Sequence, residues 1–309
     1  MSILIEANQT KFTKENLDEL LRTINLDSQK CEVFLYGLID AAQIINFNPQ
    51  KISGVADNQF ISLINESVER KTIFAGPFLI AQTDEKNGLS IEWLLNQLSQ
   101  SSCGSFIFSK QNPIVLASHL GRLSDVTHDD GTEWVMRFYD PRILPHWLAI
   151  LTEEQRDMAL ANIHTWLYQD VRGDWQKIHG NEYAMFNLPS EPMQLTSYQQ
   201  ETLMQHCLPY SIIAMLNDDD VSILAGTPDV KRYDMTRKAI EKATQEKLES
   251  MIDIKTFCTL FFRFGEKFST CAIVRQALQS PLAQSAFSQR VAAWTPNEWQ
   301  QLQEQSSDR

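Results

Sequence analysis

Apolar residues in the first half of the chain fall into short, nearly continuous runs, separated by segments in which they recur every three or four positions. The run at 32–39 predicts a strand that is covered on both faces, and the run at 104–109 predicts a further short strand. A third run, at 72–81, contains Gly76-Pro77 and predicts an edge or bulged strand, because proline cannot donate to a ladder. The three- and four-residue spacing predicts helices between these runs: 13–24, 58–70, 90–98 and 113–123.

The stretch His128–Leu151 carries the clearest succession of secondary-structure signals in the sequence. Asp130-Gly131 indicates a tight turn, and the alternation from Trp134 to Tyr139 predicts a strand with side chains on both faces. Asp140 ends this strand and is predicted to cap a helix whose first position is Pro141. An amphipathic helix follows directly, so the unit is read as a strand, an abrupt Asp-Pro corner and a helix.

The pattern changes after residue 150. Capping boxes at Thr152–Gln155 and Thr196–Gln199 predict helix starts. Beyond residue 200 the spacing is helical almost throughout, with a charged helix at about 229–251 and an aromatic core helix that Gly265 ends. The sequence therefore predicts an α+β protein, in which residues 1–150 form a mixed α/β lobe with a small mixed sheet and residues 151–309 form a mainly helical lobe.

Composition and charge narrow the possible partners. Apolar residues make up 43% and charged residues 21% of the 309 positions, as in soluble globular proteins. The net charge of −12 argues against nucleic-acid binding. Residues 1–228 hold 15 Lys/Arg against 29 Asp/Glu, which fits either a basic partner or an ordinary solubilising charge. We find no signal-peptide pattern at the first residues and no apolar run long enough to span a membrane, and we expect a cytoplasmic location without stable membrane association.

Motifs that would bring a cofactor or a covalent mechanism are missing from the sequence. The five cysteines include no C-x-x-C pair, and the six histidines include no H-E-x-x-H. Neither a G-x-S-x-G elbow nor a glycine-rich phosphate loop occurs. Asp218–Asp220 lacks the spacing of a calcium loop and is read as a solvated helix end. We therefore expect no metal, no nucleotide and no other cofactor.

Arg137 is the most informative single charge. In the predicted strand its guanidinium group is either held in an ion pair, with Asp40 or Asp140, or directed into a groove where a partner binds. Tyr139 and Arg142 are expected to share whichever role applies. A different reading takes Asp40, Arg137 and Asp140 together as the acid/base group of a hydrolase of unfamiliar design.

The run Met136–Arg142 (MRFYDPR), followed by an amphipathic helix, resembles the signature of the type VI secretion adaptor proteins, which are also called effector chaperones. Leu35–Ala42, Ala75–Leu79 and Gly104–Phe108 resemble preceding parts of that family in the same order. The resemblance covers about residues 31–150, and weaker similarity continues in the helical part of the chain.

The resemblance implies a non-enzymatic adaptor that binds a toxin effector in the cytoplasm and delivers it to the tip spike protein of the secretion machine. The candidate partner-binding or structural residues are Asp40, Arg137, Tyr139, Asp140, Pro141 and Arg142. Within this set we expect Arg137 and Asp140 to hold the corner and Arg142 to reach outward to a partner. The hydrolase remains one alternative, and a stand-alone binding or immunity protein is another.

Overall fold

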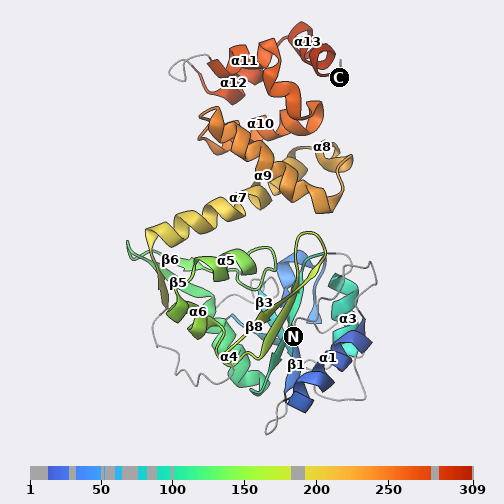
Figure 1. Cartoon of the computed structure of the whole chain (residues 1–309), viewed down its shortest axis with the longest axis vertical. Helices are drawn as coiled ribbons and strands as arrows, with labels where there is room; N and C mark the ends of the chain where they lie inside the picture. The colour runs from blue at the N-terminus through green and yellow to red at the C-terminus, as the bar shows by residue number, and fades with distance from the viewer. Residues whose placement is uncertain are drawn as a thin grey trace. The chain divides into compact units, whose positions relative to one another are not determined.

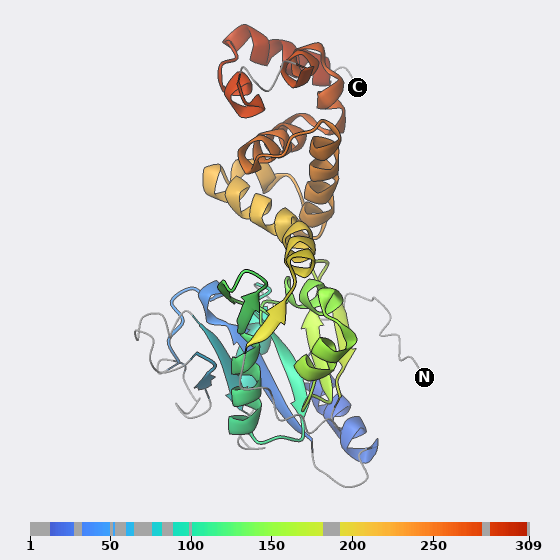
Figure 2. The same ribbon diagram turned by 90° about the vertical axis from the view of Figure 1, so that its left-hand side faces the viewer.

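The protein is described by a computed structural model, which covers residues 13–27, 33–49, 52, 60–64, 76–81, 89–98, 101–181, 192–279 and 285–307 (Figures 1 and 2). The chain forms two compact units, Met1–Gln205 and His206–Arg309. The first unit contains strands and helices and the second is helical, so the predicted α+β class is confirmed.

A six-stranded sheet with the order β2-β3-β1-β4-β7-β8 forms the centre of the first unit, and every neighbouring pair in it is antiparallel. Its strands are β1 (Phe34–Asp40), β2 (Phe60–Ser62), β3 (Pro77–Ala81), β4 (Gly104–Ser109), β7 (Thr165–Gln169) and β8 (Trp175–His179). All residues of β1 except Phe34 are buried, in agreement with the prediction that this strand is covered on both faces, and all residues of β3 and β4 are buried as well.

Helices cover both faces of this sheet (Figure 1). On one face, α1 (Lys14–Asp27) and α3 (Leu89–Leu98) bring Leu17 and Leu94 into a core with alternate residues of β1 and β4. On the other face lie α4 (Pro113–Leu123), α5 (Leu144–Ile150) and α6 (Glu153–Ala159). There the Phe138 ring packs against Trp147 and Trp166, so the stretch before α5 is anchored on β7.

A second, three-stranded sheet has the order β6-β5-β9. Its strands are β5 (Asp125–His128), β6 (Glu133–Val135) and β9 (Met193–Leu195). The pair β5–β6 is an antiparallel hairpin, whereas β5 and β9 are parallel, so this sheet is mixed. Gly131 occupies the hairpin turn at φ +81°, in agreement with the predicted tight turn.

Two predictions near β3 are wrong. Residues 60–62 of the predicted helix 58–70 form β2, which pairs with β3, while 58–59 and 65–70 lie outside the described residues. Strand β3 lies between β2 and β1 and not at the edge. Pro77 is compatible with this inner place because it is the first residue of the strand and its carbonyl accepts the N–H of Leu63.

Strands also continue beyond the boundary predicted near residue 150. β7 and β8 extend the large sheet, and β9 pairs with β5, so residues 165–195 belong to the same unit as residues 34–135. The compact units divide at Gln205/His206, within α7 (Ser197–Asp219). The capping boxes of Thr152 with Gln155 and of Thr196 with Gln199 are present, as predicted.

The second unit is a helical bundle around α10 (Met251–Phe264), which brings Phe257 and Phe261 into its core. Its other helices are α8 (Ser222–Ala225), α9 (Asp229–Gln245), η4 (Glu266–Thr270), α11 (Ala272–Gln279), α12 (Phe287–Ala292) and α13 (Pro296–Ser307). Gly265 ends α10 at φ +78°, as predicted. The charged helix predicted at 229–251 ends earlier, because Lys247 has a positive φ and Ser250 caps α10.

Candidate functional site

Asp40 is the last residue of β1, on the sheet face opposite Leu35 and Ile39. Its side chain is buried and caps the short 3-10 helix η1 (Ala41–Gln43). One carboxylate oxygen accepts the backbone N–H of Ala42 at 3.2 Å, and the other accepts the side-chain amide of Gln43 at 2.9 Å. The carboxylate is thus fixed at the end of a central strand.

The chain around Asp140 differs from the predicted strand, cap and helix. β6 ends at Val135, and turns and bends at residues 138–143 precede α5, which begins at Leu144. The carbonyl of Asp140 accepts the N–H groups of Ile143 and Leu144, while its carboxylate accepts the N–H of Arg142. Asp140 therefore closes a turn around Pro141 and does not cap the helix, because its carboxylate bonds to Arg142 instead of to the first turn of α5.

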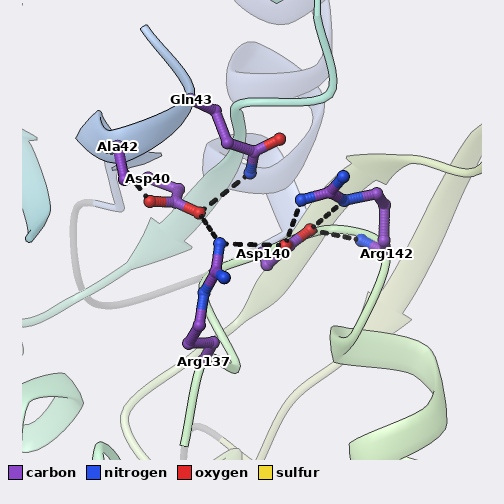
Figure 3. Close-up of polar contacts among 6 residues, drawn as sticks. All are labelled: Asp40, Ala42, Gln43, Arg137, Asp140 and Arg142. Carbon is purple, nitrogen blue, oxygen red and sulfur yellow. Dashed lines mark hydrogen bonds and ion pairs between the residues drawn. The ribbon is translucent and has the colours of Figure 1, made fainter. Parts of the chain in front are cut away.

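The two aspartates and two arginines form one network (Figure 3). Arg137 Nη2 lies 2.6 Å from Asp40 Oδ2 and 3.4 Å from Asp140 Oδ2. Arg142 approaches Asp140 with two nitrogens, Nε at 2.9 Å from Oδ1 and Nη2 at 2.7 Å from Oδ2. We call these four residues the Asp–Arg cluster. It ties the end of β1 to a turn about 100 positions later in the chain.

Burial is unequal within the Asp–Arg cluster. Both carboxylates are buried, whereas 44% of the Arg137 side chain and 36% of the Arg142 side chain are exposed. Burial is the largest single influence on each arginine and lowers its pKa, but hydrogen bonding to Asp40 or Asp140 and the negative charges of these two aspartates together outweigh it, so both pKa values are raised. The guanidinium groups therefore stay charged, cover the carboxylates and present their remaining edges to solvent.

Tyr139 and Pro141 flank Asp140 in the sequence and lie in the interior of the unit. Both residues are buried, and the Tyr139 ring packs edge-on against Phe138. Burial, with a further contribution from the negative charge of Asp40, raises the pKa of Tyr139 to about 12. All six residues singled out from the sequence thus lie at the same corner. Gln43 was missed, although a glutamine three positions after a strand-ending aspartate is a recognisable capping pattern.

The structure does not separate the two arginines into one that holds the corner and one that reaches outward to a partner. Arg142 was expected to reach outward, yet it makes the two-pronged contact with Asp140. Arg137 was expected to pair with Asp40 or Asp140; it contacts both, and the contact with Asp40 is the shorter one. Each arginine is consequently an anchor of the corner and also a half-exposed donor surface of the kind that binds carboxylates or stacks on aromatic rings.

Residues 35–158 match the protein family described as Domain of unknown function (DUF4123). This domain is associated with the effector adaptors of type VI secretion. The match covers about two-fifths of the chain and includes the whole Asp–Arg cluster. No match was found among curated proteins or among solved structures.

Within the ranges that the structure describes, no helix is both long and apolar enough to cross a membrane. No group of three or more His, Cys, Asp or Glu side chains in those ranges is placed to hold a metal ion.

Proposed function

We propose that this protein is a non-enzymatic adaptor that binds a toxin effector in the cytoplasm and loads it onto the spike protein of a type VI secretion machine. The observation that carries the proposal is the match of residues 35–158 to a domain associated with such adaptors. That association supports the role of an adaptor. Binding of an effector and of the spike protein is the part that the proposal adds.

The Asp–Arg cluster supports a structural and binding role more readily than a catalytic one. A general base needs a lone pair that can reach a substrate proton. In the cluster, Asp40 already accepts hydrogen bonds from Ala42, Gln43 and Arg137, and Asp140 accepts three from Arg142 alone. The hydrolase alternative would have to break these bonds before either carboxylate could act.

Co-purification tests the binding part of the proposal. A type VI toxin encoded beside the gene for this protein, in an order that places the adaptor gene between the spike gene and the toxin gene, is the natural candidate. The tagged protein should retain that toxin, and should retain the spike protein only when the toxin is present. Val221→Ser, which changes an exposed residue of the second unit that is not part of the Asp–Arg cluster, is a control that should retain both partners. Failure to retain either partner would contradict the proposal.

A further inference from the structure

Strand β6 (Glu133–Val135) is an outer strand of the three-stranded sheet β6-β5-β9. The bonds Met136 N–H to Ser124 O (2.7 Å) and His128 N–H to Thr132 O (3.0 Å) set the phase of its pairing with β5. In an antiparallel ladder, bonded and non-bonded pairs alternate. The backbone N–H and C=O groups of Glu133 and Val135 therefore point away from β5.

No third strand among the residues that the structure describes pairs with these outward groups. Among the described residues, none forms a hydrogen bond with the backbone N–H of Glu133 or of Val135 beyond the β5–β6 ladder. Figure 1 shows the β5–β6 hairpin at the rim of the first unit, next to the start of α7. A hydrogen bond from the Ser197 N–H to the Asp129 carboxylate (2.8 Å) joins the start of α7 to the hairpin turn. An unpaired edge on a well-anchored hairpin is suited to strand addition.

The two faces of the hairpin edge differ in character. On the inner face, Val126 and His128 of β5 are buried beside Leu195 of β9. Trp134 belongs to this face, where its ring lies 4.2 Å from the His128 ring, yet 38% of it remains exposed. Glu133 and Val135 are exposed on the opposite face. One more strand beside β6 would place a side chain against Trp134 and complete its burial.

The charge of the hairpin indicates which strand fits. Between Asp125 and Val135 there are four acidic residues and no lysine or arginine: Asp125, Asp129, Asp130 and Glu133. All four are exposed. They lie within one short hairpin, so their fields overlap at distances comparable to the Debye length of about 10 Å. A basic segment would be attracted to this edge and an acidic one repelled.

We propose that β6 takes up an extended segment of a partner protein as a fourth strand, with an apolar side chain beside Trp134 and lysine or arginine on the opposite face. That the partner is the effector rests on the proposed function. That β6 recognises a strand with basic and apolar faces does not depend on it. The outward N–H groups of Glu133 and Val135 supply the backbone pairing, and the hairpin carboxylates supply the preference for positive charge.

The test measures binding of a labelled, end-capped hexapeptide of alternating valine and lysine to the full-length protein by fluorescence anisotropy. Val135→Pro removes an outward N–H, while the bonds to β5 are made by Trp134 and Met136 and remain. Val135→Ala keeps that N–H and is the matched control. The proposal predicts binding at least tenfold weaker for Val135→Pro, a change of less than about twofold for Val135→Ala, and no binding of a valine–glutamate peptide at the same concentration.

A second probe does not depend on how the proline variant folds. The same valine–lysine peptide, N-methylated on alternate residues in each of the two registers, should lose binding in one register only. Equal binding by Val135→Pro and the unaltered protein, or equal binding of both methylated registers, would overturn the proposal. So would a lack of any peptide binding, or a change from dimer to monomer in Val135→Pro, which would show a second copy of the chain on this edge.

Repeating the comparison with the toxin separates this proposal from the proposed function. Toxin retained equally by Val135→Pro and Val135→Ala would refute the role of the β6 edge and leave the adaptor function intact. Binding of the peptide by a protein that retains no toxin would refute the adaptor function and leave the edge as a site for basic-apolar strands.

Discussion

Removing the Arg137 side chain is the sharpest perturbation of the Asp–Arg cluster. Asp40 is buried, and Arg137 at 2.6 Å is its cationic partner. Breaking a buried ion pair on one side costs about 3–5 kcal/mol. Asp40 keeps its bonds from Ala42 and Gln43, and the exposed side of Arg137 allows water to reach the gap. We therefore expect Arg137→Ala to lower the free energy of unfolding by about 2 kcal/mol, the range for a hydrogen bond to a charged group.

A double-mutant cycle identifies the partner. Arg137→Ala combined with Asp40→Asn should cost less than the sum of the single changes, by about 1–2 kcal/mol. Arg142→Ala should destabilise by a similar amount, because it removes both side-chain bonds to Asp140 and leaves that carboxylate the backbone N–H of residue 142 and one long contact to Arg137. Its coupling to Asp40 should stay below about 0.5 kcal/mol, since the two side chains share no hydrogen bond in Figure 3.

Urea unfolding followed by tryptophan fluorescence suits this measurement. Five of the seven tryptophans belong to the first unit, so the signal reports mainly on the part that contains the Asp–Arg cluster. A change in the free energy of unfolding of less than about 0.5 kcal/mol for Arg137→Ala would show that the pair with Asp40 does not stabilise the fold. Coupling of Asp40 to Arg142 and not to Arg137 would show that the partners are wrongly assigned.

Three further changes test other parts of the account. Burial raises the pKa of Tyr36 and of Tyr139 to about 12. The stability that the two neutral phenols contribute is therefore complete below pH 10 and is lost between about pH 10 and 12. Tyr139→Phe should make the urea midpoint fall less steeply across that pH range. Asn112→Ala should cost about 1 kcal/mol in urea unfolding, because the Asn112 side chain caps α4, and Asn112→Asp should cost much less. Gly180→Ala should lower the free energy of unfolding by an amount at the upper end of about 1–3 kcal/mol, seen as a lower melting temperature, because its Cβ would clash with the carbonyl oxygen of Ile163. A variant as stable as the unaltered protein would contradict this packing.

Local signals in the sequence predicted the elements that depend on their own residues. β4 matches its predicted bounds, and α4 begins where Asn112-Pro113 indicated. These features need only a continuous apolar run or a side-chain cap, which neighbouring residues supply. The Thr152 and Thr196 capping boxes are predictable for the same reason.

Elements that depend on distant parts of the chain were not predictable in this way. Residues 60–62 have helical spacing, but pairing with β3 makes them a strand. The sequence offered Asp40 and Asp140 equally as partners of Arg137, and only the fold brings Asp40 to 2.6 Å from it across 97 positions. It also gave no reason for Arg142 to turn back onto Asp140 instead of reaching outward.

Secretion by cells that lack this protein is the decisive test of its role as an adaptor. Deleting the gene should abolish export of the cognate toxin while the machine still exports its tube and spike proteins. Returning the unaltered gene should restore toxin export. Export of the toxin at normal levels from the deletion strain would contradict the account.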